Sequence, residues 1–255
     1  MRFPAGLRAR LLRRSFLQAF APDSAPAILR LSPLVRHFPE HSHRDESNVE
    51  TEWHSPKACV QAAEKAGAVA VWLGETEPLF HPAIGEITSA LTDAGSYVFL
   101  HTSGVGLRKR IHEFKPVDQL FLSLEIPLGE ADAQSSTALS QSVSLSSALE
   151  AIRVARLSGF HLCAHLTVPD AIDAAALSSR IRLLEPHRID GIVMSSASSQ
   201  STAALRAATE LIPSLAWRHF SRLLQSSYQN AVSLSDSQLV SNSQTQAAEA
   251  CEESA

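Results

Sequence analysis

Short apolar runs alternate along the chain with longer segments in which apolar residues recur at helical spacing. The short runs have the length of buried strands, and the longer segments have the one-sided pattern of packed helices. The predicted strands occupy residues 27–32, 68–73, 97–100, 119–124, 160–168 and 189–194. Strand and helix thus alternate six times, which predicts an α/β fold with a parallel sheet covered by helices and wound right-handedly.

Proline, glycine and capping residues mark the limits of several helices. Ser55 and Pro56 begin the helix that Gly67 ends, because serine caps a helix, proline fits its first turn and glycine adopts the conformation after its last. Pro82 begins a further helix, and Asp170 is the expected cap of another. Six strand–helix units suit a partial (β/α)6 TIM-like barrel, and a doubly wound sheet is the alternative.

Length and composition indicate one domain with tails. A chain of 255 residues that is 45% hydrophobic can bury one sizeable core. We predict a basic leader helix or flexible segment at residues 1–25, a barrel domain at 26–227 and a disordered acidic tail at 228–255. Five arginines precede the first acidic residue. The arginine-rich, amphipathic stretch at 3–20 also has the pattern of a targeting presequence or a surface-seeking helix, but we expect a solvated or weakly docked leader helix.

Charge, hydropathy and cysteine usage exclude several classes of protein. The net charge of −4 leaves a nearly neutral middle of the chain, which gives no argument for nucleic-acid binding. No apolar run reaches the roughly eighteen residues that a membrane span needs. Cys59, Cys163 and Cys251 are too scattered for a disulfide framework or a metal knuckle, which favours a reducing, cytoplasmic setting.

Polar residues gather where the predicted strands end. Parallel strands share one rim at their carboxyl ends, and chemistry in α/β proteins is found there. The rim collects Glu75, Glu77, His101, Thr102, Ser103, Ser123, Glu125, His165, Thr167, Ser195 and Ser196. Glu77, His101 and His165 are the candidate catalytic residues, as general acids and bases. Each also has a structural interpretation, in which the glutamate binds backbone amides and the histidines are ordinary buried residues.

The twenty-one residues at 33–53 are polar, charged and without period, so they are predicted to form a long loop. The loop contains His37, His41 and His43, but no ordered framework is visible around them. We therefore predict a solvated loop and no metal ligands.

Four stretches of the chain resemble motifs of one family in their order and spacing. They are GETEPLFHP at 74–82, TSG at 102–104, SLE at 123–125, and the ALEAI helix at 148–152 with the following strand that ends in TV at 167–168. These resemble, respectively, the Gly-Gly-Glu-Pro-Leu, Thr-Asn-Gly, Ser-Leu-Asp and fourth-helix patterns of the radical S-adenosylmethionine superfamily. The resemblance covers residues 27–196 and implies a partial (β/α)6 barrel.

The resemblance also implies a site for S-adenosylmethionine. The stretch 75–77 would face the methionine amino group, residues 123 and 125 the ribose and carboxylate, and the fifth and sixth strands the adenine. The cofactor-binding residues implied in this way are Gly74, Glu75, Thr76, Glu77, Thr102, Ser103, Ser123, Glu125 and Thr167.

One part of the family pattern is missing from this sequence. In the family, the loop after the first strand carries Cys-x-x-x-Cys-x-x-Cys, whose thiolates hold a [4Fe-4S] cluster, but residues 33–53 contain no cysteine. Cys59 falls in the next helix and Cys163 within a strand. Without a cluster no electron reaches the sulfonium and no radical forms. We therefore expect a degenerate domain without the cluster, a ligand-binding or accessory protein.

The candidate cofactor is S-adenosylmethionine, and the candidate partner is an intact radical S-adenosylmethionine paralogue or a small polar ligand. Two alternatives remain open. The first is an enzyme of another class, which uses Glu75, Glu77, His101, Glu125 and His165 for acid–base chemistry on a small polar substrate. The second is a true radical enzyme whose cluster loop is altered.

Overall fold

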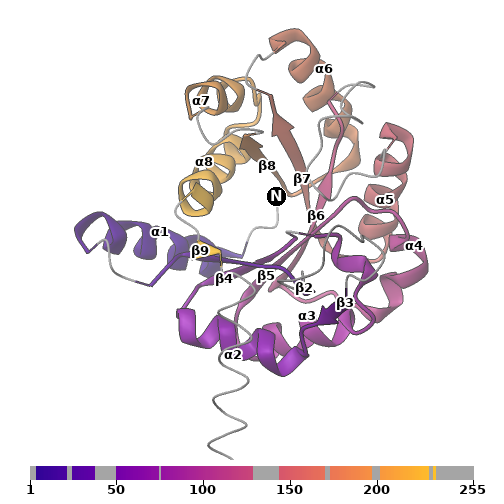
Figure 1. The fold of residues 1–255 in the computed structure, drawn as a ribbon. Coiled ribbons are helices and arrows are strands. Elements are labelled where there is room, and N and C mark those ends of the chain that lie inside the picture. The colour runs from indigo at the N-terminus through magenta and orange to yellow at the C-terminus, as the bar shows by residue number, and fades with distance from the viewer. Residues whose placement is uncertain are drawn as a thin grey trace, which may run out of the picture.

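The computed structural model describes residues 4–21, 25–37, 50–74, 76–128, 144–169, 173–196, 202–229 and 232–233 of the 255-residue chain. Its centre is a parallel sheet in which six strands curl into a half-barrel, as predicted (Figure 1). These strands are β1 (Ile28–Leu31), β4 (Ala70–Leu73), β5 (Tyr97–Thr102), β6 (Leu120–Glu125), β7 (His161–Val168) and β8 (Gly191–Ser196). The short strand β9 (Val232–Ser233) pairs in parallel with the outer edge of β1.

The strand order is β8-β7-β6-β5-β4-β1-β9, so the six barrel strands follow one another in space as they do in the chain. A doubly wound sheet reverses its strand order at a switch point, and this sheet does not. The partial-barrel alternative is therefore confirmed.

Helices cover both faces of the curved sheet. The outer face packs against α2 (Pro56–Ala66), α3 (Ile84–Asp93), α4 (Leu107–Arg110), α5 (Leu145–Leu157), α6 (Ala174–Leu184) and α7 (Thr202–Glu210). The inner face packs against α1 (Ala5–Phe20) and α8 (Leu215–Gln229), as Figure 1 shows. Three short 3-10 helices complete the fold: η2 (Pro78–Phe80), η3 (Ile111–Glu113) and η5 (Glu185–His187).

The inner face holds a core of its own. Trp72, Phe99 and Phe121 are fully buried there, on three consecutive strands. Their rings stack in sequence, with centroid distances of 5.7 Å from Trp72 to Phe99 and 4.8 Å from Phe99 to Phe121. Each aromatic pair contributes about 1 kcal/mol beyond the area that it buries. These three rings fill the inner face nearer the amino ends of the strands, and the polar side chains of the inner face lie beyond them, nearer the carboxyl ends.

The inner helices α1 and α8 pack close to the sheet, and a glycine in β8 allows one of these contacts. A Cβ added to Gly191 of β8 would lie 2.4 Å from the Phe220 ring, so this ring of α8 rests directly on the strand backbone. Helix α1 packs on α8, and its Leu7 and Leu11 are fully buried in the inner core. Residues of the predicted basic leader thus form a helix that contacts the barrel.

Several helix limits follow the signals in the sequence. The Ser55 hydroxyl accepts a hydrogen bond from the Ala58 amide at 3.2 Å, and Gly67 follows the end of α2 with φ +59°. The cap of α6 was predicted wrongly, because the Asp173 carboxylate accepts the amides of Ala175 and Ala176. Asp170 lies outside the described residues.

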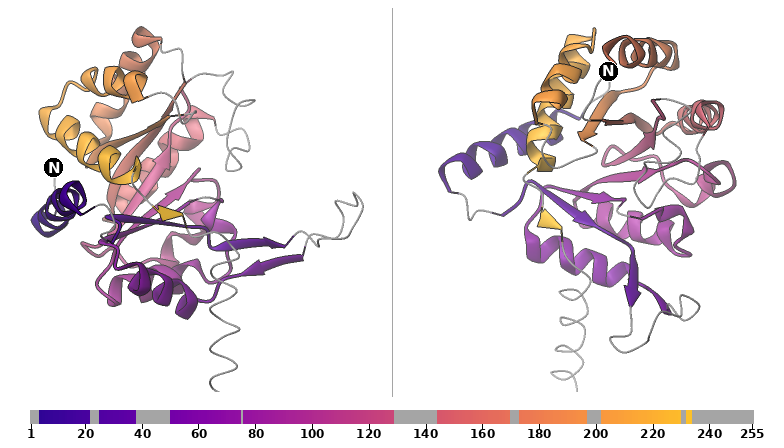
Figure 2. Two further views of the ribbon diagram at one scale, coloured as in Figure 1. Left: turned by 60° about the vertical axis from the view of Figure 1, so that its left-hand side comes forward. Right: turned by 45° about the horizontal axis from the view of Figure 1, so that its top comes forward.

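The segment predicted as a long loop at 33–53 contains an antiparallel hairpin instead. Strands β2 (Leu34–His37) and β3 (Glu50–Trp53) pair with Leu34 opposite Trp53, and the hairpin extends away from the barrel (Figure 2). The prediction missed it because each strand has only four residues and mixes charged with apolar side chains. His41 and His43 lie outside the described residues, as does nearly all of the predicted tail from residue 228 onward.

Among the described residues, no helix has both the length and the apolar character to cross a membrane.

Candidate functional site

Glu77 joins the ends of two strands. It lies in the loop after β4, is 7% exposed, and both of its oxygens accept hydrogen bonds from the end of β5. Oε1 accepts from the Thr102 hydroxyl at 2.5 Å and from the Leu79 amide at 3.1 Å. Oε2 accepts from the Ser103 amide at 2.8 Å and from the Ser103 hydroxyl at 2.6 Å. Four donors fill the lone pairs of a carboxylate, so Glu77 is placed to hold the two loops together.

The same three residues fix the turn that follows β5. The Thr102 hydroxyl accepts from the Gly104 amide at 3.0 Å, and the Ser103 hydroxyl accepts from the Val105 amide at 3.3 Å. Gly104 has φ +81°, a conformation that favours glycine. Thus the TSG stretch forms its turn through hydrogen bonds that run back to Glu77.

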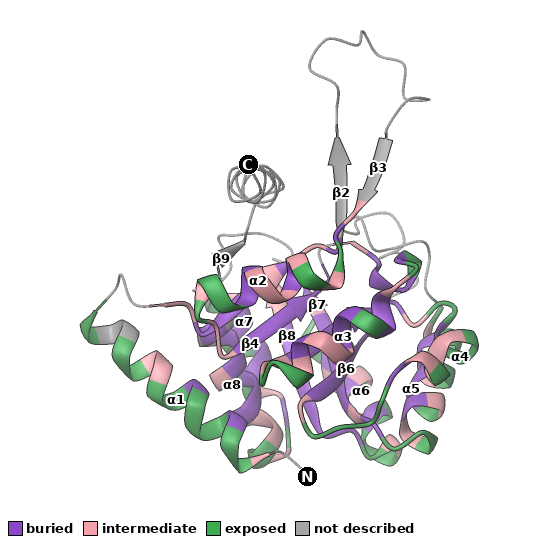
Figure 3. Cartoon of the chain, turned by 90° about the horizontal axis from the view of Figure 1, so that it is seen from below, coloured by how far each residue is buried: buried purple, intermediate pink, exposed green. Residues whose placement is uncertain are grey.

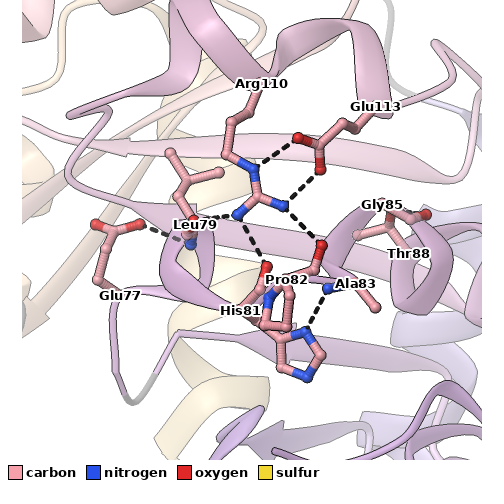
Figure 4. A network of polar contacts seen from close by, with 9 residues as sticks. All are labelled: Glu77, Leu79, His81, Pro82, Ala83, Gly85, Thr88, Arg110 and Glu113. Atoms are coloured by element: carbon pink, nitrogen blue, oxygen red, sulfur yellow. Dashed lines mark hydrogen bonds and ion pairs between the residues drawn. The ribbon is translucent and has the colours of Figure 1, made fainter.

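Arg110 fixes the other end of the Glu77 loop (Figure 4). Its guanidinium forms two bonds with the Glu113 carboxylate, Nε to Oε1 at 2.7 Å and Nη2 to Oε2 at 2.5 Å. The same group donates to the carbonyl oxygens of Leu79, of His81 at 2.8 Å and of Pro82 at 3.1 Å. One side chain therefore binds three carbonyls in and just after η2, which fixes the path of the loop.

His81 locks the same loop onto the base of the hairpin. Its Nδ1 accepts a hydrogen bond from the Ala83 amide at 2.9 Å, so the ring proton is on Nε2, which donates to the His54 carbonyl at 3.0 Å. The ring also lies edge-on to Trp53, at a centroid distance of 4.9 Å. Burial is the main cause that lowers the pKa of His81.

A pair of histidines lies on the inner face, next to the aromatic row of Trp72, Phe99 and Phe121 and nearer the carboxyl ends of the strands. His101 of β5 and His165 of β7 are each 5% exposed, and their ring centroids are 4.3 Å apart in an edge-to-face arrangement. The Trp72 ring lies 5.3 Å from His101 and 5.8 Å from His165. A Cβ on Gly74 would lie 2.5 Å from the His101 Cβ, so only glycine lets this strand end approach the histidine.

Burial makes these side chains neutral at physiological pH. It lowers the pKa of His101 to about 4 and the pKa of His165 well below its usual value, and the neighbouring His101 contributes to the second shift. Burial also raises the pKa of the Glu125 carboxyl, and the negative charge of Glu77 raises it further. These shifts share one main cause, which is burial away from water that disfavours the charged form of each group.

His165 and two side chains on the neighbouring strand β6 carry buried polar atoms without a hydrogen-bond partner among the described residues. These atoms are the Ser123 hydroxyl, Glu125 Oε2 and both ring nitrogens of His165. Glu125 and His165 are paired in register across β6 and β7, and Ser123 is paired with His101 across β5 and β6. A buried polar group without a partner costs about 1–3 kcal/mol, so this cluster is a candidate ligand site.

The other predicted site residues lie along the same rim. The Thr76 hydroxyl is 3.1 Å from the Ser32 hydroxyl after β1, and the Thr167 hydroxyl is 3.5 Å from the Ser195 hydroxyl between β7 and β8. Ser196 ends β8. Glu75 lies outside the described residues. The catalytic and cofactor-binding roles of these residues stay predictions.

Sequence reasoning did not name Trp72, His81 or Arg110 as candidate site residues, although His81 falls within the 74–82 stretch. Trp72 could have been found, because it shares the inward alternation of Phe99 and Phe121 on neighbouring strands. Arg110 has no such signal, since its carbonyl partners at positions 79, 81 and 82 lie 28 to 31 residues earlier in the chain.

The two described cysteines lie in separate cores on opposite faces of the sheet. Cys59 packs in the outer core and Cys163 in the inner one. Burial raises the pKa of Cys59 to about 12 and the pKa of Cys163 well above its usual value, so both are protonated thiols. Neither fits a [4Fe-4S] cluster, which needs converging thiolates. Within the described part of the chain, no three His, Cys, Asp or Glu side chains converge as a metal site would require.

Comparison with solved structures shows where this arrangement occurs elsewhere. SuiB from Streptococcus suis, solved with its precursor peptide SuiA and with S-adenosylmethionine, aligns with a TM-score of 0.51 and 14% identity over 80% of this chain. Over this alignment the chain shares its fold with SuiB. A third SuiB structure aligns over 90% of the chain, with a TM-score of 0.50 and 13% identity.

The alignments span about half of SuiB, 47% to 53% of its length. No family model matches the sequence, and no curated protein matches it. At this level of identity the likeness shows the fold alone.

Proposed function

We propose that this chain is a radical-S-adenosylmethionine-like domain without a [4Fe-4S] cluster, which acts as a ligand-binding or accessory protein in the cytoplasm. The observation that carries the proposal is the cluster of buried polar atoms without partners at Ser123, Glu125 and His165. Donors and acceptors of a bound molecule would satisfy these atoms. They lie at the carboxyl ends of the strands, where α/β barrels bind their ligands.

The proposed loss of the cluster rests on the cysteines of this chain. Residues 33–53 contain no cysteine, and the thiols of Cys59 and Cys163 are buried on opposite faces of the sheet. An iron–sulfur cluster is normally held by cysteine thiolates. We therefore propose no electron-transfer step at this site.

S-adenosylmethionine is the ligand that we propose. It has an ammonium group and hydroxyls that can donate to Glu125 Oε2, and ring nitrogens that can accept from Ser123 and His165. A cationic donor beside Glu125 would remove the cost of burying its charge and favour the ionised carboxylate. Glu77 and Arg110 would act indirectly, by holding the loop after β4 against this site.

Calorimetry of the iron-free chain with S-adenosylmethionine tests this proposal. We expect binding that Glu125→Gln weakens at least about tenfold, because a charge-assisted hydrogen bond is lost. The matched control is Glu150→Gln, since Glu150 lies on the surface of α5 in an ion pair with Arg108. A chain that binds the cofactor only after reconstitution with iron and sulfide, as a brown protein with about four irons, would overturn the cluster-free proposal.

A small-molecule enzyme that uses acid–base chemistry is the second candidate. The observation that favours it is the shifted pKa of three adjacent groups, His101, Glu125 and His165. For an enzyme, His165→Gln would abolish turnover of a bound substrate and leave its affinity nearly unchanged. For a binding protein, the same change would reduce affinity and no turnover would be seen in either chain.

We propose as partners a small polar ligand or an intact radical S-adenosylmethionine paralogue. Co-expression with such a paralogue, followed by size-exclusion chromatography, tests the second of these. A complex that persists through the column supports the accessory role, and separate elution of the two proteins contradicts it.

A further inference from the structure

Helix α1 is apolar on two opposite faces. Leu7 and Leu11 are fully buried against the barrel, whereas Leu12, Phe16 and Phe20 are 50%, 65% and 75% exposed. Successive helical residues advance by about 100°, so the three exposed side chains lie on the side opposite the two leucines. The Phe16 and Phe20 rings are 4.8 Å apart and form one aromatic surface. A helix that only covered the barrel would have a polar outer face.

Arginines border this outer face and also fix the helix in place. Arg8 and Arg13 are exposed, one on each edge of the apolar stripe. Arg14 points toward the barrel and donates to the Gly67 carbonyl at 2.8 Å. Arg10 donates to the Gly95 carbonyl at 3.2 Å, and its guanidinium lies 5.9 Å from the Tyr97 ring centroid. The barrel therefore determines which side of α1 faces outward.

Helix α1 lies at the periphery of the molecule, and exposed residues run along its length (Figure 3). It contains no acidic residue, and the first acidic residue of the chain is Asp23. The whole chain has a net charge of −4, so positive charge is concentrated on this helix. The surface therefore suits an occupant that is apolar within and negatively charged at its boundary.

We propose that the outer face of α1 docks on an anionic lipid bilayer. Phenylalanine and leucine side chains would enter the boundary between headgroups and acyl chains, and Arg8 and Arg13 would contact the acidic headgroups. The helix would lie flat on the surface and would not span it. A second copy of the chain fits less well, because it would bring arginines against arginines on helices without acids.

Flotation of the full chain with vesicles tests this proposal. We expect binding to vesicles of phosphatidylcholine and phosphatidylserine, and little binding to phosphatidylcholine alone. Phe16→Ser with Phe20→Ser should lower the partition coefficient at least about tenfold, because both rings lose their burial in the bilayer. Arg8→Gln with Arg13→Gln should lower it about twenty-five-fold, because each arginine near an anionic surface strengthens binding about fivefold.

Matched controls remove exposed apolar side chains and exposed positive charges elsewhere on the surface. Leu157→Ser with Leu183→Ser removes two exposed leucines of α5 and α6, and Lys109→Gln with Lys115→Gln removes two exposed charges. Neither pair should alter vesicle binding, and circular dichroism should show that all variants are folded. Equal binding by the Phe16 and Phe20 variant, no binding by the unaltered chain, or a dimer or protein complex that depends on the two rings would overturn the proposal. None of these results bears on the ligand site at Glu125.

Discussion

The His101 and His165 rings meet edge to face at a centroid distance of 4.3 Å, although one strand lies between β5 and β7. The curvature of the half-barrel brings them together, since side chains on a concave face converge. Gly74 supports this arrangement, because the strand end beside His101 leaves no space for a Cβ.

Gly74→Ala should destabilise the protein by about 1–3 kcal/mol, because the new methyl group would lie 2.5 Å from the His101 Cβ and force the backbone to move. Urea unfolding measures the loss. In NMR spectra of the folded protein, the chemical shifts of the His101 and His165 ring protons should also change. Gly95→Ala is the control, since nothing surrounds its Cβ and only its φ of +84° is strained. If the ring signals shift equally in both variants, the contact does not determine the pair.

Glu77→Gln should cost about 1–3 kcal/mol of stability. The amide nitrogen of glutamine cannot accept a hydrogen bond. If it replaces Oε2, the Ser103 amide and hydroxyl lose their acceptor, and the Ser103 amide stays buried without a partner. Glu86→Gln, on the exposed side of α3, should change the free energy of unfolding by less than about 0.5 kcal/mol. Equal losses in the two variants would mean that the Glu77 bonds do not stabilise the loops.

The stability of the protein should fall as the pH is lowered from about 6.5 to about 4. The folded pKa of His101 is about 4 against an ordinary value of 6.5, so in this range the unfolded chain binds a proton that the folded chain does not. The loss from His101 is about 3 kcal/mol over this window, and His165 adds a loss in the same direction. Glu125 has the opposite effect. Its pKa is raised in the folded state, so its contribution to stability is present at low pH and is lost as the pH rises through the folded pKa.

Denaturant unfolding at a series of pH values checks this dependence. His101→Asn should flatten the slope between pH 6.5 and pH 4, and His219→Asn, at an exposed position on α8, should leave it unchanged. A slope that is the same in all three proteins would contradict the burial of a neutral histidine.

Arg110→Lys should destabilise the loop after β4, because an ammonium group cannot bind Glu113 through two nitrogens and reach three carbonyls as well. We expect a loss of about 1–3 kcal/mol. The pKa of Glu113, which Arg110 lowers through its hydrogen bonds, should rise. Arg108→Lys is the control, since Arg108 makes an exposed pair with Glu150. Unchanged protection of the Leu79 amide from hydrogen exchange would show that Arg110 does not hold the loop.

The sequence predicted the alternation of strands and helices because the outer core repeats a local pattern, with apolar helix faces against apolar strands. It also predicted that Glu77, Thr102 and Ser103 lie at one rim. It did not predict that Glu77 has both oxygens filled, because three of the four donors come from Thr102 and Ser103, twenty-five and twenty-six residues later. It did not predict the orphan atoms of Ser123 and His165 either, since burial on a concave face depends on curvature.

The Phe220 ring rests on the backbone of Gly191, at the far edge of the sheet from β1. Because α1 packs on α8, a side chain of any size at position 191 would displace α8 and tilt α1 with it. The orientation in which the phenylalanines of α1 would contact a lipid surface therefore depends on the absence of a side chain at Gly191. A substitution in β8 would then change membrane affinity although the residues of α1 that make the contact stay the same.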